Sequence, residues 1–170
     1  MDTSKRILPE HEEEFPNLFP TGYGKSSEED EFYNCFAFAA DKNNTEVWWT
    51  PVRMGNGFYW PEGLDKKTDI NTFIKLYKIE GGFEPDENNS TALEGGIEKV
   101  ALYVDDQNEV THAARQLEDG SWASKLGDWE DVEHNKLEGL SGDINKPGYG
   151  KVVKILKRER IKKDHPVTVS

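Results

Sequence analysis

The residues best suited to chemistry are one cysteine and one of four histidines. Cys35, the only cysteine, opens the run CFAFAA, whose strong helix formers predict a short helix over residues 34–41. His112 lies in the middle of VTHAARQL, which we predict as a strand. A thiol can attack the carbonyl carbon of an amide or ester while an imidazole carries the proton. We therefore predict Cys35 as the nucleophile and His112 as the general base.

The position of Cys35 at a helix start has a chemical rationale. Backbone N–H groups there and a nearby imidazole both favour the thiolate, and the same N–H groups can hold an oxyanion. We expect Asn34 to help position the loop or the oxyanion. The competing interpretation is a core thiol, because free cysteine is among the most buried residue types and Phe36 and Phe38 flank it.

A catalytic imidazole needs a third group to orient it. If the segment EDG before Ser121 is a three-residue loop, Ser124 and Asp128 share the strand face of His112. If the turn has two residues, Lys125 takes that place instead. Asp128 is the chemically better candidate, since a carboxylate also stabilises the imidazolium.

Five aromatic residues cluster in the loop-like stretch EVWWTPVRMGNGFYWPEG. Beside a catalytic cysteine they would form a substrate groove, and we name Trp49 and Trp60 as candidate substrate-binding residues. The alternative is that these aromatic residues cap the core. The acidic run EDVEH, residues 130–134, lacks EF-hand spacing and is predicted to be a hydrated surface, so we predict no metal site and no cofactor.

Elements expected along the chain give the fold class. TDINTFIKLYKIEG carries a helical period, a capping start and a glycine stop. EKVALYV, EVTHAARQL and SWASKL are separated by turn sequences and predict a meander of three strands, with YGKVVKILKR as a fourth. We predict an extended acidic arm at 1–30, one α+β domain at 31–158 with N-terminal helices packed on an antiparallel sheet of about four strands, and a basic tail at 159–170.

Charge and composition limit the partners and the compartment. The 170 residues include 33 acidic and 21 basic ones, for a net charge of −12, although the last twenty residues are basic. This acidity argues against nucleic acid as a partner. We find no signal-peptide pattern, no membrane span and no cysteine pair for a disulfide, so we expect a cytoplasmic protein with no membrane partner.

Several motifs together resemble known families. YNCFAFAAD, WWTP, YWPEG, THAARQLEDGSWASKLG and EDVEH look like an uncharacterised bacterial domain family, over about residues 15–158. More loosely, the order of Cys35, His112-Ala113 and Asp128 resembles papain-like and transglutaminase-like cysteine hydrolases. KVALY also resembles a strand of NlpC/P60 hydrolases, but Lys99 stands where their catalytic histidine would be. That departure leaves His112 as the base.

These observations lead to two functional hypotheses. The first is a Cys/His-dependent hydrolase or acyl transferase, of the peptidase, amidase or deamidase type, acting on an unidentified amide or ester in a protein or peptide substrate. The alternative is a non-catalytic acidic binding or immunity-type interaction module.

Overall fold

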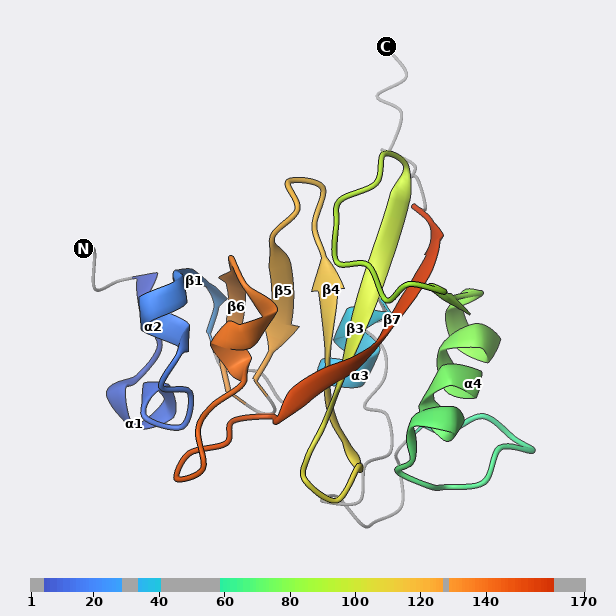
Figure 1. The fold of residues 1–170 in the computed structure, drawn as a ribbon, viewed down its shortest axis with the longest axis horizontal. Helices are drawn as coiled ribbons and strands as arrows, with labels where there is room; N and C mark the ends of the chain where they lie inside the picture. The colour runs from blue at the N-terminus through green and yellow to red at the C-terminus, as the bar shows by residue number, and fades with distance from the viewer. Residues whose placement is uncertain (1–4, 29–33, 41–58, 127–128, 161–170) are drawn as a thin grey trace.

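The computed structural model describes residues 5–28, 34–40, 59–126 and 129–160 (Figure 1). Two predicted site residues, Trp49 and Asp128, lie outside these ranges. The helices are α1 (Pro9–Glu12), α2 (Leu18–Thr21), α3 (Cys35–Ala39), α4 (Ile70–Gly81) and the 3-10 helix η2 (Leu137–Leu140). The strands are β1 (Tyr23–Ser27), β2 (Glu84–Pro85), β3 (Ile97–Val104), β4 (Val110–Gln116), β5 (Trp122–Lys125), β6 (Asp131–His134) and β7 (Lys151–Glu159).

Seven strands form one sheet in the order β1-β6-β5-β4-β3-β7-β2, and every neighbouring pair is antiparallel. The predicted α+β fold, with N-terminal helices packed on about four strands, is therefore wrong, because the described chain is mostly β with few, short helices. The strands that the prediction missed are β1, β6 and β2, with the sequences YGKSS, DVEH and EP. Main-chain pairing holds these strands in the sheet, and a side-chain pattern does not reveal such pairing.

The predicted meander is present as β3, β4 and β5. The N–H of Leu117 donates to the C=O of Ser121 at 2.8 Å, so the EDG segment forms the three-residue loop. Gln116 then pairs with Trp122. As a result Ser124 lies on the same face of the sheet as His112, and the alternative register is excluded.

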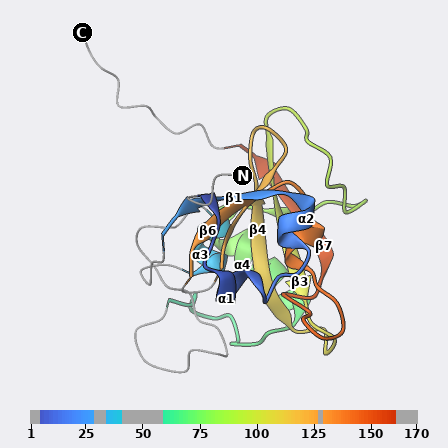
Figure 2. The same ribbon diagram turned by 90° about the vertical axis from the view of Figure 1, so that its left-hand side faces the viewer.

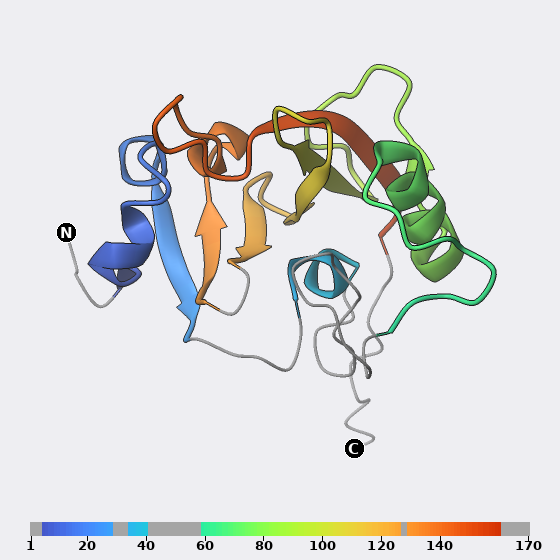
Figure 3. The same ribbon diagram turned by 90° about the horizontal axis from the view of Figure 1, so that it is seen from below.

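Buried side chains form a separate cluster on each face of the sheet. The helix-side cluster joins α3 and α4 to alternate residues of the central strands, including Val100, Leu102 and Ala113. The arm-side cluster joins the N-terminal segment to the intervening residues Ala101 and Tyr103, among others. Figure 3 shows α3 and η2 on opposite sides of the curved sheet, and Figure 2 looks onto the end that carries α1, α2 and β1. Strands β3 and β4 are therefore buried on both faces.

The predicted helix after residue 68 is confirmed as α4. The side chain of Asp69 accepts a hydrogen bond from the N–H of Thr72 at 2.8 Å, which caps the first turn. Gly82 ends the helix with a φ of 70°, in the left-handed region that favours glycine. The buried face of α4 contributes Phe73 and Leu76 to the helix-side cluster.

Lys99 is completely buried on the arm side of β3. Its ammonium lies 2.6 Å from the carboxylate of Glu94 and 3.5 Å from that of Asp86, and it donates to the C=O of Ser90 at 2.9 Å. These partners tie β3 to the loop before it. The residue that departs from the NlpC/P60 pattern thus occupies a structural position.

We predict that Lys99→Ala lowers the free energy of unfolding by about 2–5 kcal/mol, the range for truncating a fully buried long side chain. Lys157→Ala is the matched control, because the Lys157 side chain is 40% exposed and lies 3.9 Å from the same Asp86 carboxylate. The control should change stability by less than about 1 kcal/mol. Urea unfolding measures both, and equal losses would contradict the assignment.

Candidate functional site

Cys35 is the first residue of α3, as the sequence predicts. The side-chain oxygen of Asn34 accepts a hydrogen bond from the N–H of Ala37 at 3.1 Å and caps the helix. Asn34 therefore positions the start of α3 itself. All five residues of the helix are buried, and α3 packs against β4 and β5.

Cys35 is 6% exposed as a residue and lies in the helix-side cluster. Burial raises its pKa to about 12, although backbone hydrogen bonds, the first from Ala113, and the charge of Lys125 act to lower it. The sequence-based expectation of a thiolate is wrong for this state, because desolvation outweighs the groups that favour the anion. Cys35 is a neutral thiol at neutral pH.

His112 lies on β4, as predicted, and is completely buried. Its ring stacks on that of Tyr149, with centroids 4.0 Å apart and planes 2° apart, and Tyr103 meets it edge-on at 5.3 Å. Burial, followed by the nearby His134, holds the pKa of His112 well below its usual range. Neither ring nitrogen has a hydrogen-bond partner among the described residues, so His112 is a neutral imidazole with no partner there.

The two predicted catalytic side chains approach β4 from different sides. The thiol packs with Ala113 in the helix-side cluster, whereas the imidazole of the preceding residue, His112, contacts Tyr103 of the arm-side cluster. No hydrogen bond joins them, since both imidazole nitrogens are unpaired. Tyr149, which stacks on His112, packs against the arm-side cluster, and burial raises the pKa of its phenol.

Ser124, one of the two candidates for orienting His112, binds a different histidine. Its hydroxyl lies 2.8 Å from Nε2 of His134, and Nδ1 of His134 lies 3.0 Å from the C=O of Lys136. A carbonyl only accepts, so Nδ1 carries the proton and Nε2 accepts from Ser124. Burial lowers the pKa of His134 to about 4.

Trp60, a candidate for substrate binding, is partly buried against the helix-side cluster. Its indole N–H donates to the C=O of Leu64 at 2.7 Å, and its ring meets Phe73 edge-on at 6.0 Å. Trp60 thus holds the chain segment before α4 against that helix. Its partner in the prediction, Trp49, and the second candidate for orienting His112, Asp128, lie outside the described residues.

A family model matches residues 24–157, from β1 into β7. The chain belongs to that family, Domain of unknown function (DUF7689). No curated protein and no solved structure matches the chain. Within the described ranges, no helix is long and apolar enough to cross a membrane. The DUF7689 match contains Cys35 and His112 but begins after α1 and α2.

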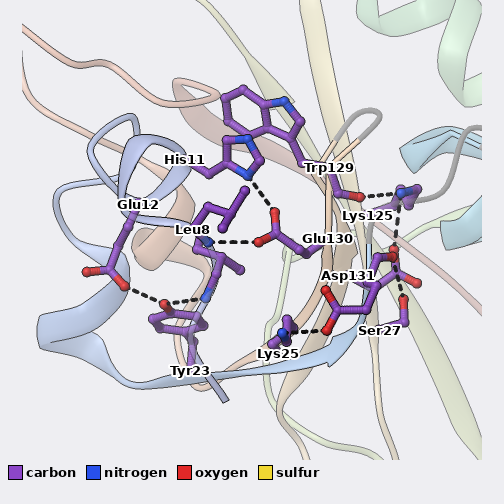
Figure 4. Close-up of polar contacts among 12 residues, drawn as sticks. Leu8, His11, Glu12, Tyr23, Lys25, Ser27, Lys125, Trp129, Glu130 and Asp131 are labelled. Carbon is purple, nitrogen blue, oxygen red and sulfur yellow. Dashed lines mark hydrogen bonds and ion pairs between the residues drawn. The ribbon is translucent and has the colours of Figure 1, made fainter. Parts of the chain in front are cut away.

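The segment outside the DUF7689 match is joined to the buried residue before β6 by hydrogen bonds that the sequence did not predict (Figure 4). Nδ1 of His11 lies 2.6 Å from the carboxylate of Glu130, whose other oxygen accepts from the N–H of Leu8 at 2.8 Å. The ring of His11 stacks on Trp129 with centroids 3.8 Å apart. No local signal links His11 and Glu130, because 119 positions separate them along the chain.

The acidic run 130–134 is not the hydrated surface that we expected. Glu130, Asp131 and His134 are buried. Burial acts to raise the pKa of Glu130, but hydrogen bonds from its own backbone, Leu8 and His11 outweigh it and lower the pKa. Asp131 lies 3.6 Å from the ammonium of the buried Lys125, which also donates to the C=O of Trp129 (Figure 4). Pairing across strands makes this burial tolerable.

We predict that stability falls as the pH drops from about 6.5 to 4. His134 has an ordinary pKa of 6.5 and a folded pKa of about 4, so the unfolded chain binds its proton first. Acid therefore favours unfolding, by up to about 3 kcal/mol for this group. His134→Gln should flatten the dependence over this window. Urea unfolding at pH 7, 6 and 5 measures it, and an unchanged slope in the variant would contradict the assignment.

We also predict slow alkylation of Cys35. With a pKa of about 12, far above the ordinary 9.0, the native thiol should react with iodoacetamide at pH 7 at least about 100-fold more slowly than in urea. Cys35 is the only cysteine, so mass spectrometry of the intact chain reports this site alone. Equal rates in the native and unfolded states would show that the thiol is open.

Proposed function

We propose that the chain is a Cys/His-dependent hydrolase or acyl transferase acting on an amide or ester, with Cys35 as nucleophile and His112 as general base. One observation carries the proposal: the imidazole of His112 is completely buried, yet both nitrogens lack a partner. Leaving a buried polar group unpaired costs about 1–3 kcal/mol, which an apolar residue at this position would avoid. A free proton acceptor is what a general base requires.

Neighbouring groups support the assignment of Cys35 as the nucleophile. The main chain of Ala113 interacts with the thiol and directly follows His112. The charge of the buried Lys125 favours negative charge on the sulfur. The order of a helix-start cysteine before a strand histidine is similar to that in papain-like and transglutaminase-like hydrolases. The proposed substrate is an amide or ester of a protein or peptide.

The protonation states determine the proposed chemistry. Both groups are neutral at rest, so His112 would take the thiol proton as the sulfur–carbon bond forms. It would return that proton to the leaving amine or alcohol as the carbon–nitrogen or carbon–oxygen bond breaks, which leaves a thioester on Cys35. Water, or a second acceptor, would then give its proton to His112 while it attacks the thioester, and the thiol would be restored. Because the thiol and the imidazole lie on different sides of β4, this chemistry requires a rearrangement of α3 and β4 that brings them into contact.

The test uses p-nitrophenyl acetate as an activated ester and intact-mass detection of the acetyl thioester. We expect the wild type to acylate and turn over, and Cys35→Ala to do neither. His112→Phe keeps the stacking on Tyr149 but removes the base, so acylation should fall by about 100-fold or more. Urea unfolding of His112→Phe should show a loss below about 1 kcal/mol, since the replacement leaves no unpaired polar group. Acylation of His112→Phe at the wild-type rate would sink the proposal.

A non-catalytic interaction module is the second candidate, and the raised pKa and near-complete burial of the Cys35 thiol favour it. A core thiol needs no base. In that case the wild type would not acylate under any condition that keeps it folded, and His112→Phe would be at least as stable as the wild type.

A further inference from the structure

Strand β7 is paired along one side and mostly open along the other. It pairs with β3 over its full length, from Lys151 to Glu159. On its outer side β2 reaches only Leu156 and Lys157. Among the described residues, no strand covers the outer side of 151–154.

The loop that follows β2 contacts one further residue of β7, Ile155. The N–H of Asp86 donates to the C=O of Ile155 at 2.9 Å, and the side chain of Asn89 accepts from its N–H at 3.0 Å. The loop thus hydrogen-bonds both main-chain groups of Ile155, as a paired strand would, and no described residue continues this pairing toward Lys151. Beyond this point no described residue pairs with the outer side of the edge, so its main-chain groups are available for a further strand.

A groove follows this open edge, with a volume of about 370 Å³. It is lined by the consecutive run 151–155, by Asn89 and Thr91, and by Leu137, Glu138 and Ser141. Because five consecutive residues of β7 line the groove, the groove runs along the strand. Its shape therefore suits an extended chain.

Thr91, which lines the groove, is held from inside the protein. Gln116 is completely buried and its Nε2 donates to the C=O of Thr91 at 2.9 Å. This hydrogen bond fixes the position of Thr91 in the groove lining.

The charge of the open edge differs from that of the whole chain. The chain carries −12, whereas β7 carries three lysines and an arginine against one acid. Arg158 is bound by Glu98, and Lys157 lies 3.9 Å from Asp86. Lys151 and Lys154, at the open part, have no ion pair with any described residue. Glu138 is the one acid of the groove.

We propose that the outer edge of β7 at 151–154 docks an extended, acidic segment of a partner protein, which adds to the sheet as a strand. Main-chain hydrogen bonds would hold the segment, and alternate side chains would meet the groove walls. Lys151 and Lys154 would select carboxylates and repel basic segments. This inference is independent of the chemistry proposed for Cys35.

Fluorescence anisotropy with a labelled eight-residue peptide of alternating Glu and Val tests the proposal. We expect binding that Lys151→Glu or Lys154→Glu weakens at least tenfold and that salt reduces. Lys75→Glu, the same charge change on the exposed face of α4, should leave the affinity unchanged. Hydrogen exchange should show protection of the amides of 151–154 in the complex.

Two further peptides separate strand addition from plain charge attraction. The same peptide with N-methyl groups on alternate amides, made in both registers, should lose binding in one register, and an alternating Lys and Val peptide should not bind. The proposal is overturned if both methylated peptides bind like the parent, if Lys75→Glu weakens binding equally, or if the parent does not bind. Sedimentation provides a further test. If the wild type dimerises and Lys151→Glu abolishes the dimer, the occupant of the edge is a second copy of the chain, and the proposal of an acidic partner is overturned.

Discussion

Burial of β3 and β4 on both faces is the constraint on which the rest of the structure depends. A one-sided sheet can turn its polar residues to water, but these two strands have no such side. Every polar side chain on them must find a partner inside the protein or remain unpaired at a cost. Lys99 is satisfied by carboxylates and a carbonyl, Gln116 is half satisfied, and His112 is not satisfied at all.

The same constraint sets the electrostatics of the candidate site. Removing water from both sides of β4 leaves the thiol of Cys35 protonated and the imidazole of His112 unprotonated. Cys35 and His112 are therefore not a thiolate–imidazolium ion pair. Their reactivity depends on contact between the two groups, whereas the thiol lies in the helix-side cluster and the imidazole lies against Tyr103 of the arm-side cluster.

Much of the fold was accessible from the sequence where a side-chain pattern exists. The helix α4 has a period, a cap and a glycine stop, and the meander β3-β4-β5 has turns between apolar runs, so both were predicted. The strands β1, β6 and β2 have no such pattern, and the sheet was therefore underestimated. The strand position of His112 followed from the same meander, whereas the turn that places Ser124 beside it had two solutions until the register was known.

The remaining parts of the site depend on contacts between distant segments. The stacking of Tyr149 on His112 and the pairing of His11 with Glu130 join positions that no local pattern connects. Burial of the acidic run 130–134 was missed for the same reason, because acidic residues indicate a surface unless their partners are known. Composition predicted hydration there, and cross-strand pairing overrode it.

The contact of His11 with Glu130 and Trp129 also bears on where this domain ends. The family match starts at residue 24, yet Ile7, Phe15 and Leu18 are part of the arm-side cluster, and the carboxylate of Glu130 is bound from residues 8 and 11. The folded unit therefore begins before the residues that the family model matches. A fragment cut at residue 24 would expose the arm-side face of the sheet, so the start of the family match does not mark the limit of the hydrophobic core.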